Sequence, residues 1–362
     1  MGHVHTCTFI PAHIEAAIFP ECSAATHQLH ELCAHNEPKE LRSRVVYDIT
    51  APSNLRMPPI PKRPGIRMFD ANNRVLLPGV PYGLNEDPIH DRVASATYRS
   101  LVAFVDLLQS PSMKRKGIDD KNGDILCTVH YGKNYENAYN DSKRIVVGDG
   151  GKILKHFGES LTTIAHEAGH GVVFKTANFA DEGQPAAMHE CYADIFAACT
   201  EQKFLNVTVD DPKATWLIGD ELIPGVAALR SMKNEKAYVG VPGLGDDMQP
   251  KRMSDYGMRD ASGKVIGPYP KEYDNGGAHE NGPKNREFYE FATALGGYSW
   301  DKPLFVWYET LKQSKPTTDF YQHTDLMLKF VDGFYHKGSA ESEAAYKAAT
   351  IVETYGTKRP SK

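Results

Sequence analysis

Two histidines and a glutamate lie together in the stretch His166-Glu167-Ala168-Gly169-His170. In a helix of about 3.6 residues per turn, positions four apart share one face, so both imidazoles can present a nitrogen to a single tetrahedral metal ion. Glu167 lies beside them without having to bind the metal. Because this short pattern also arises by chance in unrelated chains, it needs a third ligand before it indicates a zinc site.

The flanking residues predict the helix that holds this motif. Ser160 can cap its N-terminus, and apolar residues recur at helical spacing on one side: Leu161, Ile164, Ala165, Ala168 and Val172. We therefore expect a half-buried helix.

A third ligand is predicted at Glu190, in a second apolar helical pattern that can run to Phe204. Asp194, one turn later on the same face, can accept the free N–H of a ligand histidine and fix its tautomer. The alternative is that both carboxylates are solvated, as most helical carboxylates are. The joint spacing with the upstream motif favours the metal site.

With Glu190 and Asp194, the motif resembles that of the thermolysin family of zinc metallopeptidases. Three further segments agree with the family in order and spacing. Residues 129–139 are similar to its substrate-binding edge strand, residues 229–232 to a segment with a pocket-lining arginine, and residues 274–281 to the segment with a catalytic histidine. The resemblance spans residues 45 to 354 and is densest between 128 and 281.

The resemblance implies zinc bound by His166, His170 and Glu190, with a water in the fourth position whose pKa falls toward about 7. Glu167 would take the water proton and pass it to the leaving amine, as a general base and then acid.

The resemblance also implies roles around the metal. His279 would stabilise the oxyanion, oriented by Asp274, although His279 taken alone would be interpreted as a surface-loop histidine. Asn137 and the backbone of Ala138 would hold the substrate as an added strand. Arg230 would shape the pocket for the residue after the cut, which is expected to be large and apolar.

Residues 5–11 resemble the start of the short propeptide of protealysin-like members. We therefore interpret residues 1–50 as a pro-segment whose boundary lies between 40 and 65. Cys7 has two alternatives: a thiolate that caps the metal or plugs the cleft, or a small apolar residue that packs the pro-segment.

The expected fold class is α+β, with the two lobes of thermolysin-like enzymes. Residues 51–176 should form a mainly β lobe that includes the motif helix, and residues 177–362 a mainly helical lobe. The motif helix would lie between the lobes. Helical patterns cover residues 93–108, 188–204, 286–295, 302–312, 320–335 and 339–355.

Composition excludes several functions. The formal net charge of −5 and the lack of a basic stripe argue against nucleic acid as a partner. There is no apolar run long enough to cross a membrane and no secretory signal, so we expect cytoplasmic synthesis with any export by a non-classical route. The six cysteines do not form a disulfide framework. The expected partners are a peptide or protein substrate and the chain's own propeptide, and we expect a monomer.

Some positions depart from the family. His189 replaces a common asparagine; it could compete for the metal, but support of His170 is favoured. Asp181 stands where an oxyanion tyrosine is expected, so either the loop is shifted or His279 acts with less help. Asn140 replaces a common tryptophan, which suggests a different substrate preference.

The family's paired calcium site is eroded in this chain. Glu201 and Asp220 match two of its positions, whereas Thr162, Thr215 and Leu217 occupy three others. Fewer anionic ligands lower calcium affinity, so calcium is possible but the double site is not predicted.

The sequence therefore predicts a zinc endopeptidase made as a self-inhibited precursor, which cleaves before large apolar residues. The alternative is a catalytically silent relative that binds peptides or proteins. Asp181 favours the alternative, whereas Glu167 counts against it, because a binding module has no use for a proton shuttle.

Overall fold

The computed structural model describes residues 7–8, 10, 65–84, 87–88, 90–220, 222–233, 235–242, 244–259, 265–267 and 280–356. His279 and Asp274 lie outside these residues, as does most of the expected pro-segment. Of Cys7, only the backbone is described.

One mixed sheet of six strands forms the N-terminal part of the described chain, in the order β1-β5-β6-β4-β2-β3. Strands β2, β4 and β6 run parallel, and β3, β5 and β1 are antiparallel to their neighbours. The strands are β1 (Cys7–Thr8), β2 (Ile66–Asp70), β3 (Val80–Leu84), β4 (Ile125–Val129), β5 (Ala138–Asn140) and β6 (Ile145–Val147). The run of β-branched residues in β6 is buried throughout, as expected for a strand inside a sheet covered on both faces.

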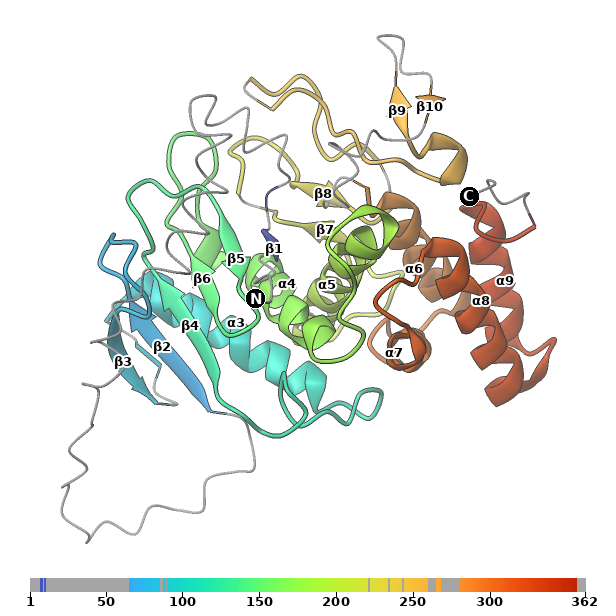
Figure 1. Cartoon of the computed structure of the whole chain (residues 1–362), viewed down its shortest axis with the longest axis horizontal. Coiled ribbons are helices and arrows are strands. Elements are labelled where there is room, and N and C mark those ends of the chain that lie inside the picture. The colour runs from blue at the N-terminus through green and yellow to red at the C-terminus, as the bar shows by residue number, and fades with distance from the viewer. Residues whose placement is uncertain are drawn as a thin grey trace, which may run out of the picture.

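Helices dominate after the sheet, so the α+β prediction with a sheet-rich N-terminal part and a helical C-terminal part is confirmed (Figure 1). The helices are α3 (Arg92–Leu108), α4 (Leu161–Phe174), α5 (Gly183–Leu205), α6 (Gly282–Leu295), α7 (Lys302–Gln313), α8 (Phe320–Val331) and α9 (Ala340–Ile351). Two short hairpins, β7 (Leu217–Ile218) with β8 (Arg230–Ser231) and β9 (Met258–Arg259) with β10 (Val265–Gly267), lie between α5 and α6. None of the helices in these described ranges has the length and apolar character needed to span a bilayer.

Helix α4 carries the two histidines and lies between the sheet and α5 (Figure 1). Ser160 is its N-cap, and the Ser160 hydroxyl accepts a hydrogen bond from the backbone N–H of Thr163 at 3.3 Å. The expectation of a half-buried helix is wrong, because every residue after Leu161 is buried. The sheet with α3 on one side of α4 and α5 on the other cover even its polar residues.

A glycine sets the distance between α4 and α5. A Cβ atom added at Gly169 would lie 3.1 Å from Ala193 Cα and 3.2 Å from a ring carbon of Phe196. Any side chain at this position would therefore push the helices apart. The hydrophobic core is continuous across this contact, from Ile66 in the sheet to Ala348 in α9.

His130 joins the end of β4 to the start of α3. Its Nδ1 lies 2.7 Å from a carboxylate oxygen of Asp149, and its Nε2 lies 2.9 Å from one of Asp91. Asp91 also caps α3 by accepting from Ala94 N. The hydrogen bond with Asp149, aided by Asp91 and opposed by burial, raises the pKa of His130 to about 9.

This raised pKa predicts a pH-dependent contribution to stability. Because the folded pKa exceeds the unfolded value of about 6.5, the contribution is complete below about pH 6.5 and disappears as the pH rises through about 9. His130→Gln should lower the free energy of unfolding by on the order of 2 kcal/mol near pH 6 and by much less near pH 10. Chemical denaturation across this range measures the difference. His336→Gln, at an exposed position, controls for the loss of a histidine. A difference between wild type and His130→Gln that does not change with pH would contradict the prediction.

Candidate metal centre

The structure brings His166, His170 and Glu190 together. One ligand atom from each lies within 4.8 Å of the others, and all three residues are buried. Glu190 Oε2 is 3.3 Å from His166 Nε2, and Glu190 Oε1 is 3.6 Å from His170 Nε2. The two imidazole rings are nearly perpendicular, with centroids 4.5 Å apart. Helix α4 supplies both histidines and α5 supplies the glutamate.

Several buried polar atoms of this group have no hydrogen-bond partner among the described residues: His170 Nε2, Glu190 Oε2 and both carboxylate oxygens of Glu167. Buried polar atoms are costly unless a partner or a ligand satisfies them. Two imidazoles and one carboxylate are the donor set of catalytic zinc sites, which leave one position open. The residues therefore fit a zinc ion.

Asp194 orients the first histidine. Its Oδ1 lies 2.7 Å from His166 Nδ1, the contact expected from the sequence. Burial alone would raise the pKa of Asp194, but the charge of Arg230 and the contact with His166 hold it below its usual range. The carboxylate is thus ionised, and it directs the Nε2 of His166 toward Glu190.

The two histidines have opposite electrostatic environments. Burial opposes protonation of His166, but Asp194 and Glu190 outweigh it and raise its pKa to about 9. Burial, together with the nearby charge of His166, lowers the pKa of His170 well below its usual range. A metal ion at this site must therefore replace a proton on His166.

Glu167 is fully buried next to these ligands. Burial raises its pKa to about 8, with His166 opposing and Glu190 adding to the shift. A carboxyl group whose pKa lies near neutrality can both take up and return a proton.

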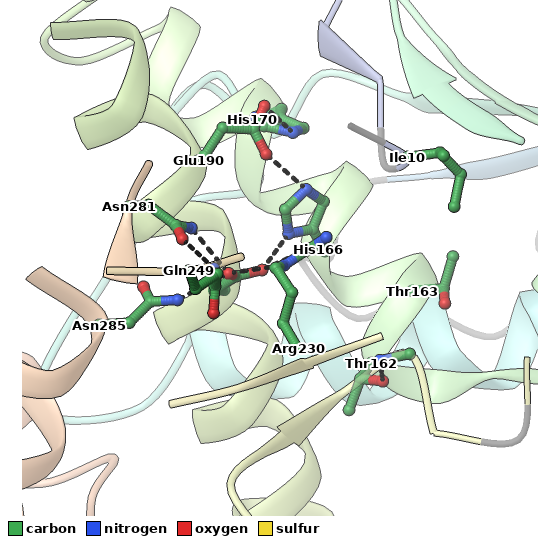
Figure 2. A network of polar contacts seen from close by, with 12 residues as sticks. Ile10, Thr162, Thr163, His166, His170, Glu190, Arg230, Gln249, Asn281 and Asn285 are labelled. Atoms are coloured by element: carbon green, nitrogen blue, oxygen red, sulfur yellow. Dashed lines mark hydrogen bonds and ion pairs between the residues drawn. The ribbon is translucent and has the colours of Figure 1, made fainter. Parts of the chain in front are cut away.

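Arg230 lies on β8, and its guanidinium forms a bidentate ion pair with the carboxylate of Asp194. Nε is 3.1 Å from Oδ2 and Nη2 is 2.8 Å from Oδ1, a two-pronged ion pair that is almost fully buried. The sequence predicted a role in a substrate pocket; the structure adds this support of Asp194 (Figure 2).

Strand β5 carries Ala138 and follows Asn137, the two residues expected to bind a substrate backbone. In this structure the N-terminal strand β1 pairs with it, Cys7 opposite Asn140 and Thr8 opposite Tyr139. Ile10 N donates to Asn137 Oδ1 at 3.1 Å, and the Ile10 side chain is fully buried.

His189 contacts the second histidine of the motif, whereas Asp181 lies on the surface. The His189 ring packs against His170 and Phe174, with centroid distances of 4.8 and 4.5 Å. Its Nε2 lies 3.4 Å from the backbone oxygen of His170. Asp181 is exposed, in the turn before α5.

Sequence reasoning missed the contacts that three amides make at the site. Asn140 on β5 donates from Nδ2 to the backbone oxygen of Glu167 at 2.6 Å, which links the edge strand to α4. Asn281 and Asn285, at the start of α6, both donate to Asp194. The spacing of these two asparagines, four positions apart just after His279, was the available signal.

Threonine hydroxyls contact the remaining carboxylates at the positions where the family's double calcium site is expected. Thr162 Oγ1 donates to Asp220 Oδ1 at 3.3 Å and accepts from Gly219 N at 3.0 Å. Thr215 Oγ1 donates to Glu201 Oε2 at 3.5 Å. Neutral hydroxyls thus occupy positions where calcium requires anionic oxygens.

Comparison with known proteins places this geometry in one family. Residues 91–174 match the model of the thermolysin metallopeptidase catalytic domain, and residues 177–353 match that of its alpha-helical domain. Protease PrtS of Photorhabdus sp. (strain Az29) is 37% identical over 271 residues, which cover 72% of this chain and 69% of that protein. An extracellular metalloprotease of Pectobacterium carotovorum is 34% identical over 67% of this chain and 68% of its own length.

A solved structure agrees over almost the whole chain. The precursor of protealysin, a metalloproteinase from Serratia proteamaculans, superposes with a TM-score of 0.75 at 27% identity, covering 96% of this chain and 99% of that one. The two-lobed thermolysin-like fold is thereby confirmed. The chain is a metalloendopeptidase of the thermolysin family.

Proposed function

We propose that this chain is a zinc-dependent neutral endopeptidase made as a self-inhibited precursor. The observation that carries the proposal is the buried group of His166, His170 and Glu190 with the carboxyl group of Glu167 beside it. When bound, zinc supplies a Lewis acid for the scissile carbonyl and an acidified water. His166, His170 and Glu190 hold the ion, and Asp194 keeps His166 in the required tautomer.

Glu167 acts as the proton shuttle. It takes a proton from the attacking water and later gives it to the nitrogen of the leaving amine, which breaks the peptide bond. Its fully buried position and raised pKa support this assignment. His279, oriented by Asp274, donates a hydrogen bond to the oxygen that becomes negative.

The substrate lies along β5 as an added antiparallel strand, held by Asn137 and the backbone of Ala138. The pairing of β1 with β5 supports this path, because it demonstrates that an extended segment fits the edge. Cleavage occurs before large apolar residues, with Arg230 shaping the pocket. The complete burial of the apolar Ile10 side chain is consistent with that preference.

The N-terminal segment inhibits the precursor by occupying this same edge. Pairing of Cys7 and Thr8 with β5 and the hydrogen bond from Ile10 to Asn137 use the groups that a substrate backbone needs. Substrate and pro-segment therefore compete for one strand position. Removal of the pro-segment activates the enzyme.

Substitution of the proton shuttle tests the mechanism. Glu167→Gln should retain stoichiometric zinc but lose casein cleavage by at least about a hundredfold, because the amide cannot accept the water proton. Glu190→Gln provides the contrast, since losing an anionic ligand should lower zinc content as well as activity. Zinc is measured by metal analysis of the purified proteins. Equal cleavage by wild type and Glu167→Gln would refute the mechanism, and peptide binding without cleavage by wild type would favour a silent relative.

Maturation tests the pro-segment. On incubation, the wild-type chain should shorten from its N-terminus as casein cleavage rises, whereas Glu167→Gln should keep its full mass, because self-processing needs the shuttle. Cys7→Ser should shorten the lag if a thiolate at Cys7 caps the metal. Cys22→Ser, also in the pro-segment, is the matched control. Mass spectrometry over time follows both, and an unchanged lag for Cys7→Ser would make Cys7 a packing residue.

We also propose that folding does not depend on the family's double calcium site. Millimolar calcium should leave the Tm of the zinc-loaded protein unchanged, because threonine hydroxyls already bond to Asp220 and Glu201. The triple variant Thr162→Asp, Thr215→Asp, Leu217→Glu should gain a calcium-dependent Tm. Thermal melts with and without added calcium, free of zinc-binding chelators, measure the shift. A rise in the wild-type Tm with calcium would contradict the proposal.

A further inference from the structure

Two asparagines at the start of α6 reach into the metal centre from the helical lobe. Asn281 Nδ2 donates to Asp194 Oδ2 at 2.8 Å, and Asn285 Nδ2 donates to the same oxygen at 2.9 Å. Both side chains are fully buried. In Figure 2 both asparagines lie to the left of His166 and Arg230; they come from the start of α6, which supplies none of the proposed metal ligands.

Asn281 contacts Asp194 through its side chain and does not cap its own helix. It occupies the N-cap position of α6, where asparagine is among the preferred residues, yet its side chain makes no capping hydrogen bond. Its amide instead donates to Asp194, and its Oδ1 accepts from Gln249 Nε2 at 2.6 Å. Because both the Oδ1 and the Nδ2 of Asn281 are hydrogen-bonded, the amide is held with Nδ2 toward Asp194.

The two carboxylate oxygens of Asp194 accept hydrogen bonds from different sets of donors. Oδ1 accepts from His166 Nδ1 and from Nη2 of Arg230. Oδ2 accepts from Nε of Arg230 and from the two asparagine amides. These five hydrogen bonds saturate a group with about four lone-pair sites, so the carboxylate cannot rotate without breaking several of them.

Arg230 contacts both oxygens of Asp194 and holds the plane of the carboxylate, whereas the two asparagines contact Oδ2 alone from a different element. The asparagines are short and attached to the end of a packed helix. They fix Oδ2, which leaves Oδ1 facing His166.

We infer that Asn281 and Asn285 are positioning residues that hold the His166 imidazole in its metal-binding orientation by way of Asp194. The inference rests on the proposed zinc function. It assigns part of the zinc affinity to α6, more than a hundred residues after α4 in the chain.

Zinc release from the full-length holoprotein tests this inference. All variants carry Glu167→Gln, so that proteolysis does not shorten the chain. Asn281→Leu and Asn285→Leu keep the branching of the side chain at Cγ but remove the donor. Loss of a hydrogen-bonding residue in the outer shell of a metal site typically lowers metal affinity by tenfold or more. Each variant should therefore release zinc to a competing chelator about tenfold faster than the parent.

Asn285→Leu is the cleaner variant. Asn285 Oδ1 has no hydrogen-bond partner within the described residues, so only Asp194 loses a contact. Thr200→Val is the matched control, because Thr200 lies on α5 with Asp194, is fully buried, and among the described residues its hydroxyl bonds only to the backbone oxygen of Phe196, at 2.7 Å. Thr200→Val should release zinc at the parental rate even if its Tm falls.

The outcomes separate this inference from the proposed function. Leucine variants that fold, as judged by near-ultraviolet circular dichroism, and release zinc within twofold of the parent would overturn it. So would an equal acceleration by Thr200→Val, which would make the effect one of stability. If the leucine variants fail to fold, Asn285→Ala, which also removes the donor, decides in the same assay. A parent that binds no zinc would overturn the proposed function and this inference together.

Discussion

The metal centre depends on one buried charge, the carboxylate of Asp194. An ionised carboxylate in a protein interior is strongly unfavourable unless cations and hydrogen-bond donors surround it. Here the guanidinium of Arg230, the imidazole of His166 and two asparagine amides provide those donors. These donors come from three elements, so α4, β8 and α6 must all reach α5 before the charge is satisfied. The contacts that hold Asp194 at the metal site therefore also join helix α4 to the helical lobe.

The rest of the centre follows from close packing around that charge. Gly169 lets the backbones of α4 and α5 approach, which brings Glu190 to the two ligand histidines. At this centre the atoms without a hydrogen bond among the described residues include His170 Nε2 and both carboxylate oxygens of Glu167, where a metal ion and its water would lie. On the other side of α4, Asn140 ties the edge strand to the backbone of Glu167. Strand β5 and the helix that carries Glu167 are thus held at a fixed separation.

Departures from the family pattern have local explanations here. His189 packs its ring against Phe174 and the second ligand histidine, and Asp181 points to solvent. Asn140 replaces an aromatic residue with a hydrogen-bond donor. At the calcium positions, threonines bond to the carboxylates that remain. These substitutions replace one set of contacts with another and leave the ligand group complete.

The sequence by itself determined the features that repeat at short range. Helical periodicity and the Ser160 cap located α4, and the spacing of His166 and His170 predicted that they share a face, because residues one turn apart do so whatever surrounds them. Glu190 was predicted as the third ligand from a second helical pattern and from the family resemblance. Only the tertiary structure decided that α4 is buried on all sides, that β1 pairs with β5, and that Asn281 and Asn285 reach Asp194. Those contacts join residues about ninety or more positions apart, and a contact between distant segments leaves no periodic pattern in either one. A buried asparagine and a solvated one look alike in sequence until the fold supplies the buried carboxylate.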